Sequence, residues 1–437
     1  MPGNRTSIEK FLAASNMHPA GINTRKCCDD FTAEMTRGLN GEQSSLVMIP
    51  TYIETAREVP RGQTVIALDA GGTNLRVAAV SFDQDGKAVI EHLTRHRMPG
   101  IDAEIGKEEF FHDLADYVMP LADRSEKIGF CFSYPAEILP DKDGKLIHFT
   151  KEVKARGVDG QLLGRNLSMA MAASGADRPP RVVLLNDTAA TLLAGRNAIP
   201  DRRFSDFVGV VCGTGFNVSY VERNDLIRKL PGLDPSGSQV VNTESGSFGL
   251  APTGSVDDEF DATTATPRRY RHEKMISGAY LGTVGLFAAR SAAKAGCFSS
   301  EAAPAFSRLQ ELSTRDFNAF LLRPESGDNP LGAISLRLPA EDRTALVRLF
   351  DALVERASLF VASTISAVVL KTGKGKDPSA PVCITVDGTT YWELSSFHKR
   401  VQSHLGSFLS GDRQRAWEIT SVSDAPLLGA AIAALTN

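Results

Sequence analysis

The sequence is poor in the features that mark several classes of protein. Its 437 residues contain six cysteines and no Cys-x-x-Cys pair, so no disulfide framework is expected. The adjacent Cys27 and Cys28 are expected to be reduced thiols, and a reducing cytoplasm is the simplest compartment for the protein. The net charge of −4 offers no excess of one sign to a nucleic acid or a membrane surface, so neither partner is predicted.

Targeting signals and the commonest nucleotide-binding signatures are also missing. The N-terminal stretch MPGNRTSIEKFLAASN has no apolar core of signal-peptide length and no run that could span a bilayer. No Gly-Lys pair is followed by Ser or Thr, which excludes a Walker A loop, and neither glycine-rich turn described below opens a helix, which excludes the dinucleotide fingerprint. The remaining composition, 42% hydrophobic and 23% charged, is that of a globular chain long enough for two domains.

The stretch 64–82 predicts a turn with functional potential. An apolar strand ends at Asp69, and a second strand begins at Leu75. Gly71 and Gly72 between them predict a tight hairpin, because glycine alone adopts a positive φ without strain. Backbone N–H groups and polar side chains in such a turn suit a phosphate, and Asp69 suits a phosphate-bound Mg²⁺. A hairpin with no ligand would have the same sequence pattern, so this stretch alone leaves both interpretations open.

A later segment repeats this pattern. Residues 207–222, FVGVVCGTGFNVSYVE, again comprise an apolar strand, a Gly/Thr turn, an Asn and a second strand. Two such hairpins about 140 residues apart indicate an internally duplicated architecture in which the two turns face each other.

Five predicted strands end in polar or glycine-rich turns, which begin at Asp69, Ser133, Asn186, Gly213 and Asp387. Ligands of open α/β sheets sit beyond the carboxyl ends of the strands. If the five ends converge, their carboxylates, amides and phosphate-facing turns suit phosphoryl transfer from a nucleotide to an alcohol. Asp187 is the best candidate for the base, and the alternative is that it only caps the helix that follows.

The rest of the chain is assigned from hydrophobic periodicity and turn residues. Asp424 is expected to cap the last helix. Strands are expected over 88–93, 127–132, 146–149, 181–185, 382–386 and 417–422, and helices over 7–40, 108–122, 164–173, 189–195, 273–295, 300–312, 314–321, 339–369, 397–409 and 427–435.

Eleven short motifs occur in one order along the chain, and together they resemble a known family. They are EMTRGL (34–39), SSLVMIPTY (44–52), LDAGGTNLRV (68–77), FSYP (132–135), FTK (149–151) with KARGV (154–158), NDT (186–188), GTGFN (213–217), NTESGSFG (242–249), EKMISG (273–278) and VDGT (386–389). Over nearly its whole length the chain is similar to the hexokinase family of eukaryotic-type hexokinases and glucokinases.

The resemblance implies an α/β fold of the actin-like ATPase (ribonuclease H-like) type, duplicated into two lobes with a cleft between them. The small lobe is expected over residues 62–186, joined by the C-terminal helix 424–437. The large lobe is expected over residues 187–423, joined by the N-terminal helical segment 1–61. Closure of the lobes on the sugar would exclude water, which competes with the sugar hydroxyl as the nucleophile.

The resemblance also implies ATP-dependent, in-line phosphorylation of the 6-hydroxyl of a hexose, with glucose as the expected substrate. Asp187 would be the general base, and Lys151 would lie near the reacting phosphoryl group. The residues implied to hold the hexose are Ser133, Thr150, Lys151, Asn186, Asp187, Asn217, Glu244 and Glu273. Those implied to hold ATP and Mg²⁺ are Asp69, which would reach the metal through water, and Gly71, Gly72, Thr73, Asn74, Arg76, Gly213, Thr214, Gly388, Thr389 and Gly429. Without the motifs, Glu273 and Lys151 would be taken for solvated surface residues.

The chain departs from the family pattern at the start of the last predicted helix. The family carries a Ser-Gly-Lys-Gly run beside the nucleotide, whereas this chain has APLLG over 425–429, which leaves the phosphate donor open. Ser245 stands in place of a Trp and Tyr134 in place of a Phe, so a kinase preferring mannose, fructose or an amino sugar is one alternative. A weakly catalytic, sugar-sensing regulator is another. The length corresponds to one catalytic unit, and a monomer and a homodimer are both open.

Overall fold

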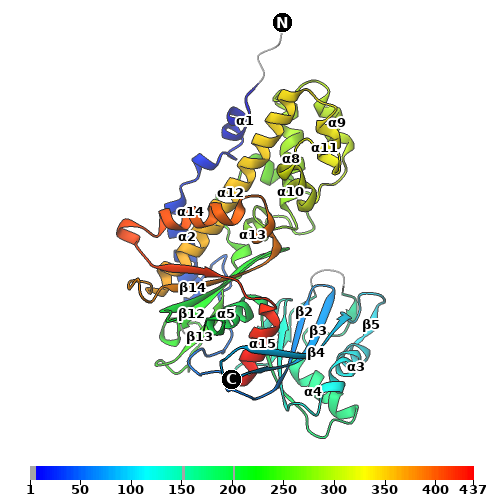
Figure 1. Cartoon of the computed structure of the whole chain (residues 1–437), viewed down its shortest axis with the longest axis vertical. Coiled ribbons are helices and arrows are strands. Elements are labelled where there is room, and N and C mark those ends of the chain that lie inside the picture. Colours follow the sequence, from blue (N-terminus) through cyan, green and yellow to red (C-terminus); the bar gives the residue numbers. More distant parts are fainter. Residues whose placement is uncertain (1–5, 150–152, 200–201) are drawn as a thin grey trace.

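The computed structural model describes residues 6–149, 153–199 and 202–437. Two β-sheets with helices packed on them make up the described chain. In Figure 1 the first sheet lies at the lower right, the second sheet lies at the centre left, and most of the remaining helices lie above the second sheet.

The first sheet has five strands in the order β10-β6-β2-β3-β4. Three consecutive strands pair antiparallel, and two later strands extend the sheet in parallel with the first of them. The strands are β2 (Val65–Gly71), β3 (Asn74–Phe82), β4 (Ala88–Arg97), β6 (Lys127–Phe132) and β10 (Arg181–Leu185).

The second sheet repeats this order. Its strands run β13-β12-β11-β14-β15, again with an antiparallel meander followed by two parallel strands, and β1 is added at one edge. The predicted internal duplication is therefore confirmed by topology. The strands are β1 (Ile49–Pro50), β11 (Asp206–Cys212), β12 (Phe216–Arg223), β13 (Ser238–Asn242), β14 (Val382–Asp387) and β15 (Trp417–Thr420).

Alternate residues of a strand point to opposite faces, and β2 shows how both faces of the first sheet are covered. Ile66 packs in a core with helices α3 (Lys107–Val118) and α4 (Leu163–Ala173). The next residue, Ala67, packs on the opposite face with helices α5 (Asp187–Ala198) and α15 (Ala425–Thr436).

Helices α5 and α15 each follow the last strand of one sheet, and they join the two halves. α15 follows β15 of the second sheet but packs on β2 and β6 of the first, whereas α5 follows β10 of the first sheet and packs on β11 of the second. Figure 1 shows α15 between the two sheets. The two helices cross where Gly429 lies against the backbone of Ala190.

The long helix α12 (Ala340–Thr372) organises the helical region. It packs against α2 (Thr24–Asn40) and α14 (Phe397–Phe408). Its length and apolar composition would allow it to cross a membrane, but 83% of its most apolar stretch is buried inside the protein, as in the core helix of a globular domain. The other helices around it are α1 (Ile8–Ala14), α6 (Ser255–Asp261), α7 (Arg271–Lys274), α8 (Leu281–Lys294), α9 (Ala302–Arg308), α10 (Thr314–Leu322), α11 (Pro330–Ser335) and α13 (Thr389–Glu393).

The structure corrects some of the predicted elements. The helix expected over 273–295 is divided into α7 and α8, because the chain between them turns so that the Gly278 N–H donates to the carbonyl of Gly213 at 2.8 Å. Strand β13 and helices α11 and α13 were not predicted. All three are short: β13 pairs with β12 and with the distant β1, α11 packs against the preceding α10, and α13 packs against α14 and the distant β11.

Candidate active site

Three strands of the first sheet deliver their polar ends to one edge. β6 runs parallel with both β2 and β10, and Cys131 near its end lies opposite Asp69 on one side and Leu185 on the other. Burial raises the pKa of the Cys131 thiol well above its usual value, and the nearby carboxylates of Asp69 and Asp187 raise it further. The two carboxylates therefore lie on either side of one strand end. Ser133, which follows β6, shares this edge.

Asp187 begins helix α5, but it does not cap it. The Asn186 side chain accepts hydrogen bonds from the Thr188 N–H at 2.9 Å and the Thr188 hydroxyl at 2.6 Å, so Asn186 is the N-cap. The alternative that Asp187 is only a helix cap is thus wrong. Its half-buried carboxylate lies at the end of β10, in the first turn of the helix.

Arg76 connects carboxylates that come from both halves of the chain. It donates to Asp69 Oδ2 from Nε at 2.9 Å and from Nη2 at 2.7 Å, and its Nη1 pairs with Asp424. Burial raises the pKa of Asp387, the charges of Asp69 and Asp424 raise it further, and the Gly388 N–H and Arg76 oppose this rise. The ends of β2 and β14 therefore lie near each other.

Asp424 is the N-cap residue of the last helix, as predicted, but its side chain makes no capping hydrogen bond. The residue adopts a left-handed conformation with φ +56°. Its carboxylate instead pairs with Arg76, which is 348 residues away in sequence.

The donor set around Asp69 fits Mg²⁺ only in part. Magnesium sites that also bind substrate phosphates use one or two carboxylates and keep several waters. Both hydrogen bonds from Arg76 use Oδ2 of Asp69, which leaves Oδ1 turned toward Gly71. Within the described ranges, no group of three His, Cys, Asp or Glu side chains could hold a metal.

The first hairpin turn differs by one residue from the prediction. Gly71 pairs with Asn74, so the two turn residues are Gly72 and Thr73 rather than Gly71 and Gly72. Gly72 has φ +65°, where glycine is favoured, and its carbonyl accepts a hydrogen bond from the Tyr134 hydroxyl. Gly71 and Asn74 remain exposed at the tip, where a ligand could reach them.

The second turn is packed against the end of β14. Gly388 has φ +118°, and a Cβ there would lie 2.3 Å from the Cys212 carbonyl oxygen, so only glycine fits. The Gly213 carbonyl accepts a hydrogen bond from the Thr390 hydroxyl at 2.8 Å. The close packing leaves Thr214 exposed on one turn and Thr389 on the other.

A second polar cluster lies beside this turn, around Glu244. Glu244 Oε1 accepts hydrogen bonds from Asn242 Nδ2 at 2.7 Å and Asn217 Nδ2 at 3.3 Å. The two amides also pair with each other at 2.8 Å, and Asn217 Oδ1 accepts from the Ser245 N–H at 3.1 Å. Burial raises the pKa of Glu244, and the two amides oppose this rise.

Glu273 joins this cluster from α7. Its Oε2 accepts a hydrogen bond from the Phe216 N–H at 3.0 Å and lies 2.9 Å from where a Cβ of residue 215 would be. A Cβ at position 246 would lie 3.1 Å from the Cβ of Glu273, so a side chain at Gly246 would also be crowded. Gly215 and Gly246 thus make room for the carboxylate, which is half-buried and is not an ordinary surface residue.

The predicted residues therefore gather in two groups at the strand ends. Thr150 and Lys151 lie outside the described residues. Gly429 is buried against α5, and helix packing alone accounts for a glycine there. Asn242 and Asp424 were not predicted as site residues, although Asn242 belongs to the NTESGSFG motif that carried the resemblance. The first group contains Asp69, Arg76, Asp187, Gly213, Asp387, Gly388 and Asp424, and the second contains Asn217, Asn242, Glu244, Ser245 and Glu273.

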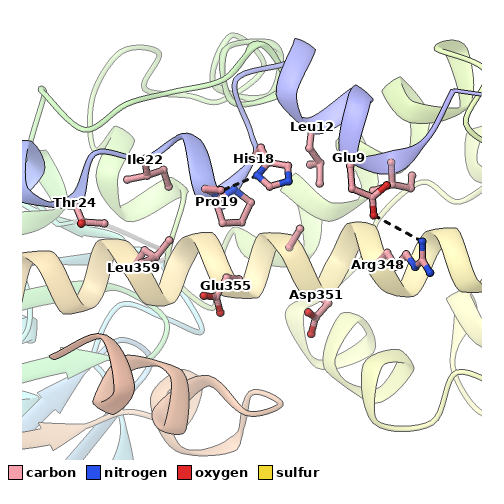
Figure 2. A pocket seen from close by; sticks show the side chains of 13 residues that line it. Glu9, Leu12, His18, Pro19, Ile22, Thr24, Arg348, Asp351, Glu355 and Leu359 are labelled. Atoms are coloured by element: carbon pink, nitrogen blue, oxygen red, sulfur yellow. Dashed lines mark hydrogen bonds and ion pairs between the residues drawn. The ribbon is translucent and has the colours of Figure 1, made fainter. Parts of the chain in front are cut away.

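An open groove of about 630 Å³ lies elsewhere, between the N-terminal segment and α12 (Figure 2). Its charged groups are paired: Arg348 lies 3.8 Å from Glu9, and Asp351 and Glu355 pair with Arg400 of α14. None of the residues predicted for the site lines this groove. The candidate site is therefore defined by the converging strand ends and not by the groove.

Comparison with known proteins identifies relatives along the whole chain. Two models of the hexokinase family match, one over residues 8–197 and the other over 207–436. Hexokinase-7 of Oryza sativa subsp. japonica is 30% identical over 440 residues, which cover 92% of this chain and 91% of that protein. Hexokinase-5 of the same plant is 29% identical over 94% of this chain and 86% of its own length. The glucose-complexed hexokinase of Schistosoma mansoni has the same fold, with a TM-score of 0.75 over 98% of this chain and 99% of that chain at 23% identity.

Proposed function

The chain belongs to the hexokinase family, and with that as the premise we propose how its residues perform the reaction and on which sugar. It is an ATP-dependent hexose kinase with the two-lobed, actin-like ATPase fold. We propose that the hexose is glucose and that the 6-hydroxyl is phosphorylated. The alternative of a weakly catalytic sugar sensor is not favoured.

The proposed general base is Asp187. The observation that carries this assignment is the cap of α5: Asn186 is the N-cap and accepts from the Thr188 N–H, so the Asp187 carboxylate is not the N-cap and lies at the end of β10 beside the end of β6. A base must reach the proton that it removes, and the position of Asp187 at the end of a strand, where ligands of α/β sheets bind, supports this proposal. Lys151 is proposed to lie near the reacting phosphoryl group, with Thr150 beside the sugar.

The hexose is proposed to bind against the Glu244 cluster. A pyranose presents neighbouring hydroxyls that each donate and accept, and carboxylates and amides can pair with two at once. Glu244, Glu273 and Asn217 offer such groups within one hydrogen-bonded network, and Asn186 and Ser133 are proposed to complete it from the first sheet. A sugar lacking one hydroxyl would leave a buried polar group unpaired, which is the basis of selectivity.

The nucleotide is proposed to lie between the two glycine-rich turns. One turn would contribute Gly71, Gly72, Thr73 and Asn74, with Arg76 behind it, and the other side would contribute Gly213, Thr214, Gly388 and Thr389. Mg²⁺ would lie on the Asp69 side and reach that carboxylate through water. Bound there, it would neutralise charge on the phosphates. Gly429 stays a proposed nucleotide-side residue in addition to its packing role.

The lobes are proposed to be residues 62–186 with the C-terminal helix 424–437, and residues 187–423 with the N-terminal segment 1–61. The packing of α15 on the first sheet supports the first of these. We propose a reducing cytoplasm as the compartment, which suits six buried and unpaired cysteines. A monomer and a homodimer are equally compatible with this proposal.

The Asp187→Ala variant tests the assignment of the base. Turnover in a coupled ADP-release assay should fall by roughly 10²–10⁴ while glucose still binds, because general base catalysis contributes that much. Asp316→Ala, in the first turn of the distant helix α10, is the matched control and should retain turnover. Near-normal turnover of Asp187→Ala would remove Asp187 as the base.

The wild-type protein should be assayed across hexoses and nucleotides in the same format. Pro426 provides no N–H at the start of α15, and residues 425–429 lack the Ser and Lys of the family run, so the nucleotide side differs from the family pattern. Glucose and ATP should give the highest kcat/KM. A higher value with mannose, fructose or an amino sugar would replace glucose, and tight glucose binding without ADP release would favour the sensor.

A further inference from the structure

The loop that carries Glu244 has a backbone conformation that needs support. Glu244 itself adopts φ +56° and ψ +46°, in the left-handed region. Such a conformation is unfavourable for a residue other than glycine, and it persists where the surroundings hold it. The single 3-10 turn η4 (Ser245–Ser247) follows at once. The position of the carboxylate therefore depends on what holds the two ends of loop 243–249.

The chain between α2 and β2 holds both ends of this loop. Before Glu244, the Met48 N–H donates to the Thr243 carbonyl at 3.3 Å, and the adjoining strand β1 pairs with the end of β13. After Glu244, the Gly249 N–H donates to the Ser45 hydroxyl oxygen at 3.0 Å. The conformation of the loop is thus tied to that of the segment containing Ser45 and Met48.

The buried carboxylate of Glu34, in α2, anchors that segment. Its Oε2 accepts hydrogen bonds from the Ser45 N–H and the Ser45 hydroxyl, both at 2.6 Å, and Arg37 pairs with Oε1. Burial alone would raise the pKa of Glu34, but the bonds from Ser45 and Arg37 lower it to about 2. The Ser45 hydroxyl donates to Glu34 and accepts from Gly249, and so links the carboxylate to the loop.

The same helix also contacts the loop through an apolar pair. Phe31, one turn before Glu34, packs edge-on against Phe248 with ring centroids 5.0 Å apart. The ring of Phe248 in turn packs edge-on against the ring of His272, the neighbour of Glu273, with the ring centroids 5.4 Å apart. α2 therefore supports the region around both carboxylates of the proposed hexose site.

We propose that Glu34 is a positioning residue for the hexose: its carboxylate acts through Ser45 to set loop 243–249 and thereby to place Glu244. The proposal rests on the proposed role of Glu244 in holding the sugar. Glu34 acts on hexose binding, so its loss changes the KM for the hexose and leaves the KM for ATP unchanged.

The test compares four variants by steady-state kinetics and by calorimetric titration with glucose. Glu34→Ala should raise the glucose KM and Kd about tenfold, the loss expected when a charged hydrogen-bond acceptor is removed. Its kcat should stay within about threefold, as for a change in ground-state binding. Glu34→Gln keeps one acceptor oxygen for Ser45 and should restore most of the affinity. Ser45→Ala should resemble Glu34→Ala, and the double variant should be no worse than either, since both changes break one link.

Asp342→Ala is the matched structural control. Asp342 is a buried carboxylate that accepts a hydrogen bond from the Ser299 N–H at 3.0 Å and one from the Ser299 hydroxyl, in a helical region away from the strand ends. It should lower thermal stability and leave the glucose KM unchanged. Equal rises in glucose KM for Asp342→Ala and Glu34→Ala, or additive effects of Glu34→Ala and Ser45→Ala, would overturn the proposal.

Glu244→Gln separates this proposal from the one on which it rests. Weakened glucose binding in Glu244→Gln with unchanged binding in Glu34→Ala refutes the positioning role alone. Unchanged glucose binding in Glu244→Gln refutes the assigned role of Glu244, and the premise is lost with it.

Discussion

Replacing Gly429 by alanine probes the contact that joins the two halves of the chain. A Cβ at this position would lie 1.9 Å from the carbonyl oxygen of Ala190 and 2.4 Å from its carbonyl carbon. Cβ atoms essentially never lie within 3.0 Å of an atom that is not bonded to them. α15 and α5 must therefore separate there by at least about 1.1 Å, the difference between 3.0 Å and 1.9 Å. The atoms in the way belong to backbone, and no change of rotamer relieves the contact. Overpacking of a core costs about 1–3 kcal/mol, and a backbone contact this close belongs at the upper end of that range.

The matched control is Gly406→Ala in the last turn of α14. A Cβ there has no atom within 4 Å, so the substitution adds only helix propensity. It should stabilise the protein by about 0.5–1 kcal/mol. The same chemical change is therefore expected to have opposite signs at Gly406 and Gly429.

Urea denaturation followed by circular dichroism measures both variants, and kcat is measured alongside. Gly429→Ala should unfold at a lower urea concentration and turn over more slowly, because separating α15 from α5 shifts the strand ends of one sheet relative to those of the other. An unfolding midpoint and kcat equal to those of the wild type would refute the view that this backbone contact fixes how the two halves meet.

Three further variants test other parts of the structure. Burial raises the pKa of Asp206 to about 7, above the value near 3.9 of an unfolded chain, so folding stability is lost as the pH rises between these values. Asp206→Asn should therefore stabilise the protein at pH 8, by about 4 kcal/mol at most, and should not stabilise it at pH 4. A difference in urea denaturation that is the same at both pH values would contradict this. Gly388→Ala places a Cβ 2.3 Å from the Cys212 carbonyl oxygen and should raise the KM for ATP more than that for glucose; equal changes would argue against a nucleotide-side position. Asp424→Asn should cost less than about 1 kcal/mol in urea denaturation, because both side chains of its pair with Arg76 are partly exposed, and a loss of 3 kcal/mol would show that the pair is shielded from water.

Several elements could be read from the sequence because their cause is local. The strand 181–185 is a run of apolar residues bounded by turn signals, and the structure has it with the same limits. The hairpin between the first two strands of the first sheet needed only an apolar run and a glycine, Gly72, that tolerates positive φ. The repeated pattern in 207–222 was sufficient to predict a duplicated fold, and the strand orders of the two sheets confirm it.

Other features could not be predicted because their cause lies in distant parts of the chain. Asp424 is followed by a helix, and local rules make it a cap, but the packing of the two sheets brings Arg76 within reach and the carboxylate pairs there instead. β13 is held by pairing with β12 on one side and, on the other, with β1, which lies far earlier in the chain; its own short sequence carries little strand signal.

For the candidate site, the sequence by itself determined which residues are present at the strand ends: the carboxylates, the amides and the glycine turns follow from motifs of a few residues. Only the tertiary structure decided how they are grouped. It placed Asp69 beside Asp387, assigned the helix cap to Asn186 rather than Asp187, and tied the loop of Glu244 to a carboxylate in α2. A motif constrains the backbone over a few residues, whereas contacts between the sheets and helices depend on how whole elements pack.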